Sequence, residues 1–147
     1  SYFPVLWSAN MSIGINLVMK LVEAAAIQLG CDYDAEIWEM HHSEKRDSPS
    51  GTALMLGNAI ANGRNQDLKI VQYGSCGKRQ PGEIGIAVSR GGGVIGDHSV
   101  IFANDGERVE ISHKAINGTI FVKGAIKAAK WLFNKPSGFY TMRDVVR

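Results

Sequence analysis

Three strand-like segments follow one another closely in the second half of the chain, and the turns between them restrict how they can pair. The segments are Ile84–Arg90, Asp97–Asn104 and Glu107–Lys114. The pair Asp105-Gly106 separates the last two, and Asp-Gly between alternating segments is among the strongest short-range signals of a β-hairpin. This run of strands predicts an antiparallel sheet.

Helical periodicity before and after these strands defines the fold class. Apolar residues recur at helical spacing over Ile13–Leu29, Ser50–Ala61 and Thr119–Asn134. Extended segments over Tyr2–Trp7 and Ala35–His41 complete the order strand, helix, strand, helix, several strands and helix. This order predicts an α+β fold, with a mostly antiparallel or mixed sheet and helices on one face.

The composition is that of an ordinary globular domain and excludes several classes of function. The 147 residues are enough for one domain with its own core, and the net charge of +2 gives no reason to expect a nucleic-acid partner. Cys31 and Cys76 lie far apart without metal-site spacing, so we expect free thiols in a reducing compartment. No segment is apolar for long enough to span a bilayer. We therefore expect no secretory signal, no membrane partner and a cytoplasmic location.

The segment Ser50-Gly51-Thr52 opens the second predicted helix and is typical of an anion site. The first turn of a helix has backbone N–H groups that the helix itself does not use. Gly51 lets a ligand approach the main chain, and Ser50 and Thr52 add hydroxyl donors. Such a helix start suits a carboxylate or a phosphate. An ordinary capped helix has the same pattern, so these three residues alone leave both interpretations open.

Groups that can move a proton lie just before this helix start. The imidazoles of His41 and His42 can accept and donate a proton, and Lys45 could fold over an anion bound at the helix. Their combination with the helix start favours a functional site over a structural loop. Metal binding is the competing interpretation. We expect no metal, because the two adjacent histidines diverge in an extended segment and no HExxH-like pattern completes a ligand set.

The residues around this loop resemble a known family. HHSEKRDSPSGTA, at 41–53, is similar to the signature of dihydrodipicolinate reductase, also called 4-hydroxy-tetrahydrodipicolinate reductase, of the lysine and diaminopimelate pathway. The flanking segments also resemble that family over nearly the whole chain. They read SANMSIGINLVMKLVEAAA, GEIGIAVSRGGGVIGDHSVIFANDGERVEISHKA and GAIKAAKWLFNKPSGFYTMRDVV.

The resemblance implies a reaction and a role for individual residues. The family reduces a cyclic dicarboxylate, formed by loss of water from a hydroxylated substrate, with hydride from NADPH or NADH. Carried over, His41 would be the catalytic acid–base residue, Lys45 the catalytic proton donor, and His42 a substrate contact. A carboxylate of the substrate would be held at the helix start by Ser50, Gly51 and Thr52. The segment that passes the nicotinamide would comprise Ser8, Ala9, Asn10 and Met11.

The resemblance also implies a domain organisation. The cofactor domain of the family is a Rossmann fold with a glycine-rich phosphate loop, and here Gly91-Gly92-Gly93 follows a strand but opens no helix. We expect this chain to be part of a longer protein, because the apolar run near its beginning has no preceding strand to pair with. Residues 1–10 would then be a remnant of the cofactor-domain strand and hinge. Residues 11–117 would be the substrate-binding and oligomerisation domain, and residues 118–147 would carry a C-terminal helix returning to the missing Rossmann domain.

Two further expectations follow from this organisation. NADPH or NADH would be bound mainly outside this chain, which alone would be inactive, and the sheet would assemble the enzyme into a homotetramer. The alternative is a non-catalytic module that binds a dicarboxylate and oligomerises. A stand-alone hydrolase or lyase that uses His41 is less favoured, because no nucleophile is obvious.

Overall fold

The computed structural model describes residues 2–71 and 77–146, which fold into two compact units. The central unit is Val18–Ile116. The terminal unit combines the described residues up to Leu17 with those from Asn117 onward. Helix α1 (Ile13–Leu29) begins in the terminal unit and continues into the central one. The predicted division into residues 1–10, 11–117 and 118–147 stays a prediction.

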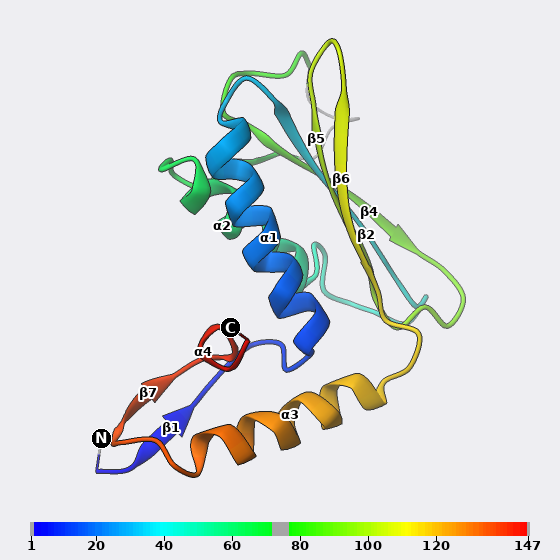
Figure 1. The fold of residues 1–147 in the computed structure, drawn as a ribbon. Coiled ribbons are helices and arrows are strands. Elements are labelled where there is room, and N and C mark those ends of the chain that lie inside the picture. Colours follow the sequence, from blue (N-terminus) through cyan, green and yellow to red (C-terminus); the bar gives the residue numbers. More distant parts are fainter. Residues whose placement is uncertain (1, 72–76, 147) are drawn as a thin grey trace. The chain divides into compact units, whose positions relative to one another are not determined.

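A five-stranded mixed sheet forms one layer of the central unit (Figure 1). Its order is β3-β4-β2-β5-β6. β4 is parallel to both β2 and β3, whereas β5 is antiparallel to both β2 and β6. The bounds are β2 Asp34–His41, β3 Ile70–Val71, β4 Ile84–Arg90, β5 Asp97–Ala103 and β6 Arg108–Lys114. The predicted α+β fold with a mixed sheet is confirmed.

The predicted antiparallel run of the three late strands is wrong for β4. The hairpin at Asp105-Gly106 forms, with Ala103 opposite Arg108. β4 does not pair with β5, however, because β2 lies between them. Every second residue of β2 is buried, from Ala35 to His41, as in a strand at the centre of a sheet. Adjacency along the chain suggested that β4 pairs with β5. In the structure β2 lies between these two strands, and its alternate residues are buried there.

Helices α1 and α2 (Gly51–Gly63) cover one face of this sheet (Figure 1). On that face Ile37 of β2 lies opposite Ile86 of β4 and Val100 of β5, and all three are buried. Leu56 of α2 and Val22 of α1 are fully buried as well. Burying an aliphatic side chain of this size contributes about 1.5–3 kcal/mol, so this layer is the main hydrophobic core of the central unit.

The two helices of the central unit approach closely at Gly63. A Cβ atom at this position would lie 2.6 Å from the carbonyl oxygen of Glu23 and 2.7 Å from the Cβ of Ala26, both in α1. Distances below 3.0 Å are not tolerated without movement of one helix. Close packing against α1 therefore requires a glycine at position 63.

The terminal unit is built on a pair of parallel strands, β1 (Pro4–Leu6) and β7 (Gly138–Tyr140). Helix α3 (Thr119–Leu132) and the short α4 (Met142–Val145) complete it. Its buried cluster contains Ala128, Met142, Val145 and Val146, with Leu6 and Trp131 packed against it. The predicted extended and helical segments at both ends of the chain are thus present, although β1 is shorter than the predicted Tyr2–Trp7.

The other predicted elements agree with the structure except near residue 70. The first helix has the predicted bounds, and the second begins one residue after its predicted cap, Ser50. The sequence also predicts a short strand over Leu68–Tyr73 and a flexible, basic loop over Gly74–Arg79. The strand is described only for Ile70–Val71, and both predicted segments lie partly outside the described residues. None of the helices in the described ranges has the length and hydropathy needed to cross a lipid bilayer.

Candidate anion and proton-transfer site

The start of α2 has the geometry of a capped helix with an open side. Ser50 has extended backbone angles, φ −64° and ψ 151°, and its Oγ accepts the backbone N–H of Ala53 at 3.1 Å. Gly51 is exposed, and a Cβ atom added there would meet nothing within 4 Å. A helix N-terminus carries partial positive charge from its backbone N–H groups. An anion can therefore approach the main chain at Gly51.

A buried carboxylate lies beneath this helix start. Glu39 of β2 is fully buried, on the sheet face that the helices cover. Its Oε1 accepts the backbone N–H of Ser50 and the Nη2 of Arg90, each at 3.0 Å. Its Oε2 accepts the Nη1 of Arg90 at 2.9 Å and contacts the Nδ1 of His41 at 2.5 Å. One side chain thus joins the predicted proton-handling residue to the predicted carboxylate-holding residue.

These contacts keep Glu39 ionised. Burial alone raises the pKa of a carboxyl group, since it disfavours the charged form. The hydrogen bonds from Arg90, His41 and the Ser50 backbone outweigh burial and hold the pKa of Glu39 below its ordinary value. The charge of Arg90 compensates the buried negative charge. The site is therefore built on a charged carboxylate.

His41 is the last residue of β2 and is only 8% exposed. Its Nδ1 faces Glu39, and its Nε2 faces Gly96, where an added Cβ atom would lie 3.0 Å away. The ring also packs edge-on against His98, with 5.1 Å between the ring centroids. His42 follows the end of the strand and is less buried than His41.

His98 of β5 lies opposite Glu39 in the strand register and is also buried. Its Nε2 is 3.1 Å from the Oγ of Ser50. Its Nδ1 is buried and has no hydrogen-bond partner among the described residues. Burial, followed by the neighbouring His41, lowers the pKa of His98 to about 4. His98 is consequently a neutral imidazole at pH 7.

Lys45 is placed by an ion pair within the loop. Its Nζ is 2.9 Å from the Oδ1 of Asp47, and the pKa of Asp47 is lowered by the hydrogen bond from Lys45. The backbone oxygen of Asp47 accepts the Nη2 of Arg90 at 2.8 Å. Arg90 therefore connects this loop to the buried Glu39. Asp47 thus holds the loop through its carboxylate, which pairs with Lys45, and through its backbone oxygen, which accepts Arg90.

Three residues of this site were not among the sequence candidates: Glu39, Arg90 and His98. A signal for Glu39 was present, because it lies two residues before His41 and an extended strand places both on one face. Arg90 and His98 come from strands on either side of β2. Their place could not be deduced without the strand order.

The predicted cofactor segment, Ser8 to Met11, lies in the terminal unit. The Oγ of Ser8 donates to the carbonyl of Asn10 at 3.2 Å, and the side chain of Asn10 accepts the backbone N–H of Ser12 at 2.9 Å. The Nδ2 of Asn16 also donates to the Asn10 carbonyl, at 2.8 Å. Local hydrogen bonds thus give this connection between β1 and α1 a defined shape.

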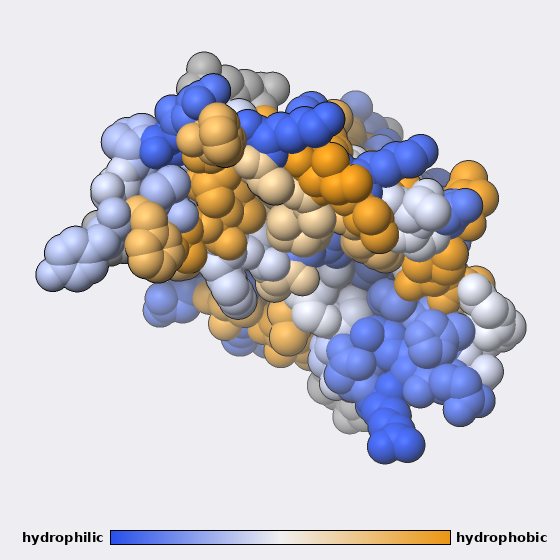
Figure 2. Space-filling view, turned by 90° about the horizontal axis from the view of Figure 1, so that it is seen from below, coloured by the Kyte–Doolittle hydropathy of each residue, from blue (hydrophilic) through white to orange (hydrophobic). Residues whose placement is uncertain are grey.

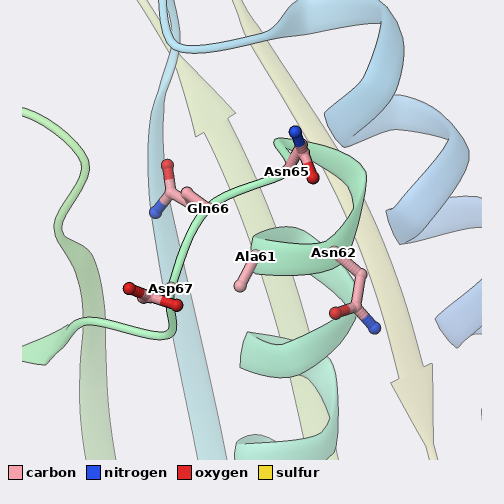
Figure 3. A pocket seen from close by; sticks show the side chains of 5 residues that line it. All are labelled: Ala61, Asn62, Asn65, Gln66 and Asp67. Atoms are coloured by element: carbon pink, nitrogen blue, oxygen red, sulfur yellow. The ribbon is translucent and has the colours of Figure 1, made fainter.

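A polar hollow at the other end of α2 is separate from this site (Figure 3). Its lining residues are Ala61, Asn62, Asn65, Gln66 and Asp67. Gln66 uses its Nε2 to bind the carbonyl of Gly82 at 2.7 Å, which indicates a structural role. Within residues 2–71 and 77–146, no group of three or more His, Cys, Asp or Glu side chains could hold a metal ion.

Comparison with known proteins identifies the family. The model of the family described as dihydrodipicolinate reductase, C-terminus, matches residues 14–146. The chain belongs to the dihydrodipicolinate reductase family. A 4-hydroxy-tetrahydrodipicolinate reductase from Wolbachia pipientis subsp. Culex pipiens is 58% identical over 97% of this chain and 56% of the relative. The reductase of that name from Zymomonas mobilis is 50% identical over 99% of this chain and 59% of the relative.

A solved structure agrees with this assignment. Dipicolinate-bound dihydrodipicolinate reductase from Paenisporosarcina sp. TG-14 matches with a TM-score of 0.72 at 26% identity, over 95% of this chain and 54% of that chain. This chain therefore spans little more than half the length of the curated relatives that it matches. The family and the α+β fold are established by these matches.

Proposed function

We propose that this chain supplies the substrate site of an NAD(P)H-dependent reductase. The reaction converts 4-hydroxy-tetrahydrodipicolinate, with loss of water and addition of one hydride and one proton, to tetrahydrodipicolinate in lysine and diaminopimelate biosynthesis. The observation that carries the proposal is the dual contact of Glu39 with the Nδ1 of His41 and the backbone N–H of Ser50. It joins a proton-transfer group to a helix start that suits a carboxylate. The family and the names of its relatives supply the identity of the substrate.

The carboxylate-holding part of the proposed site is the start of α2. The backbone N–H groups of Gly51 and Thr52 would bind one carboxylate of the ring, and the hydroxyl of Ser50 would assist. Open space next to Gly51 supports this role. His42 and the cation of Lys45 would contact the substrate from the loop. Each charge-assisted hydrogen bond contributes about 1.5–3 kcal/mol, more than the helix dipole at about 0.3–1 kcal/mol, so the direct bonds decide affinity.

The proton-handling part is His41 and Lys45. The cofactor supplies a hydride when bound, and the reduced ring then needs one proton to balance the added charge. Lys45 would donate that proton, and His41 would be the acid–base residue of the site. The ion pair between the Nζ of Lys45 and the Oδ1 of Asp47, at 2.9 Å, holds the ammonium group in the loop that precedes α2 and so supports this role.

The described residues do not fit a dinucleotide phosphate site. The glycine-rich segment 91–96 connects β4 directly to β5 and opens no helix, whereas a Rossmann phosphate loop leads into one. Only the segment Ser8 to Met11 is proposed to pass near the nicotinamide. We assign the remaining cofactor contacts to sequence outside this chain and derive no step of hydride transfer from its residues.

Assembly with other polypeptide is part of the proposal. Trp38 and Met40 lie on the sheet face away from α1 and α2 and are only half-buried, as expected of a sheet that pairs with copies in a homotetramer. Figure 2 shows hydrophobic residues reaching the surface beside hydrophilic ones on one face of the molecule. In the terminal unit Ile126, Phe133 and Phe139 are exposed and would contact the cofactor-binding part of the enzyme. A cytoplasmic location also stays a prediction.

Ligand binding to this chain tests the substrate site. Calorimetry with pyridine-2,6-dicarboxylate should detect weak binding. Lys45→Met should weaken it at least about tenfold, the value of one charge-assisted hydrogen bond. The matched control is Lys69→Met, because Lys69 is more exposed and lies near Glu83 rather than the site. Absence of binding, or equal loss in both variants, would contradict the proposed site.

Turnover distinguishes the reductase from the alternative, a non-catalytic dicarboxylate-binding module. This chain alone should show no NADPH-dependent reduction, and robust turnover would refute the placement of the cofactor site outside it. At the matching position of the full-length Wolbachia relative, His41→Gln should reduce turnover at least about a hundredfold, as loss of an acid–base group does, and leave dicarboxylate binding mostly intact. Near-normal turnover would remove His41 from the mechanism.

A further inference from the structure

Glu39 has every acceptor position in use. Each carboxylate oxygen contacts two groups. Oε1 accepts the backbone N–H of Ser50 and an N–H of Arg90. Oε2 accepts the other N–H of Arg90 and contacts the Nδ1 of His41. An ionised carboxylate can only accept hydrogen bonds. The hydrogen between Oε2 and the imidazole must therefore belong to the Nδ1 of His41.

This requirement selects one tautomer of His41. With hydrogen on Nδ1, the Nε2 of the neutral ring is an acceptor, and it becomes the donating N–H when the ring is protonated. The Nε2 faces Gly96, where any side chain would begin 3.0 Å from it. A glycine at that position leaves room at the nitrogen that exchanges the proton.

The same carboxylate also positions the carboxylate-holding half. Ser50 caps α2, and its backbone N–H is held at 3.0 Å by the Oε1 of Glu39. Movement of Glu39 would displace both the imidazole of His41 and Ser50, the residue immediately before the helix. The distance between the proton-transfer group and the anion-binding helix start is thus set by one fully buried side chain.

We propose that Glu39 is a positioning residue that fixes the His41 tautomer with Nε2 as the exchanging nitrogen and aligns that nitrogen with the start of α2. This inference rests on the proposed function for its catalytic meaning. The tautomer itself is a property of the chain without substrate. Glu39 acts only through His41 and Ser50 and touches no reacting atom.

Nitrogen-15 NMR of the histidine side chains in this chain, recorded without ligand above pH 7, tests the proposal. The Nδ1–H form of His41 should exceed the Nε2–H form at least about tenfold, as a hydrogen bond to a charged acceptor requires. In Glu39→Gln the amide no longer demands a donor from the ring, and a measurable Nε2–H population should appear. Glu36→Gln is the matched control, because Glu36 lies on the same strand with its side chain on the opposite face.

The parent spectrum alone can overturn the inference, even if Glu39→Gln fails to fold. A predominant Nε2–H form in the parent, or an unchanged tautomer in a folded Glu39→Gln variant, would refute it. In the full-length Wolbachia relative, the matching variant should lose turnover at least about tenfold with KM changed less than about threefold. Equal changes in turnover and KM would indicate a merely structural role. If the unsubstituted chain does not bind the dicarboxylate, the proposed function is refuted, whereas the inferred tautomer of His41 is still tested by the NMR spectrum.

Discussion

Acidification should destabilise the central unit through His98. The pKa of this residue is lowered from 6.5 to about 4, so the unfolded chain binds its proton more readily than the folded chain between these two values. The contribution of the neutral His98 to stability is therefore fully present above about pH 6.5 and is lost as the pH decreases toward 4. Since each pKa unit corresponds to about 1.4 kcal/mol, the total loss is about 3 kcal/mol, of which about 2 kcal/mol is lost between about pH 7.5 and about pH 5.

This pH range isolates histidine from carboxylate titration. The pKa of Glu39 is lowered from an ordinary value of 4.5, so its contribution is lost only at pH values below that range. His113, opposite His98 in the strand register, also has a pKa lowered by burial and contributes in the same direction. The loss above about pH 5 should therefore come from the buried imidazole of His98 and the partly buried imidazole of His113, with His98 the larger contributor.

Urea unfolding across this range measures the effect. The free energy of unfolding should fall by about 2 kcal/mol or more in the parent, and that loss should shrink by about 2 kcal/mol in His98→Gln. The matched control, His113→Gln, should retain most of the loss. A direct NMR titration in the folded chain should find His98 neutral at about pH 5. A protonated His98 at that pH, or an unchanged pH dependence in His98→Gln, would refute the reasoning.

Three further predictions concern packing and charge. Ser50→Ala should lower the free energy of unfolding by about 2–3 kcal/mol in urea, because it removes the helix cap and the hydroxyl next to a buried imidazole; no loss would contradict the observed contacts. Gly63→Ala should cost about 1–3 kcal/mol by forcing α1 and α2 apart, whereas Gly51→Ala, with open space around its Cβ, should stay within about 0.5 kcal/mol; equal effects would contradict the packing. Raising the salt concentration about tenfold should weaken pyridine-2,6-dicarboxylate binding several-fold in calorimetry, since Lys45 is partly exposed; salt-independent binding would exclude an ionic contribution.

Local signals in the sequence predicted the elements of the fold well. Helix α1 follows from apolar spacing and ends before Gly30, whose φ of +61° suits glycine. Ser50 caps α2 because its hydroxyl can accept a backbone N–H three residues later. The β5–β6 hairpin follows from Asp105-Gly106. In each case the interaction that decides the structure lies within a few residues of the chain.

The strand order and the buried residues of the candidate site were not predicted in this way. The sequence indicated His41, Lys45 and the start of α2 because they share one loop. Glu39 could have been added from its place in the strand, but a charged residue beside apolar neighbours is more often assigned to a solvent-exposed face. The burial of a carboxylate is credible only once its donors are known, and Arg90 lies 51 residues further along the chain.

The wrong strand order and the missed residues have one cause. If β4 paired with β5, as the sequence suggested, β2 would not have β4 on one side and β5 on the other. With β2 between them, the parallel pairing places Arg90 beside His41, and the antiparallel pairing places His98 opposite Glu39. Arg90 then neutralises Glu39 and holds the carbonyl of Asp47, while His98 contacts the cap of α2. The insertion of β2 at the centre of the sheet is therefore the step that joins a reactive loop to the buried charges that position it.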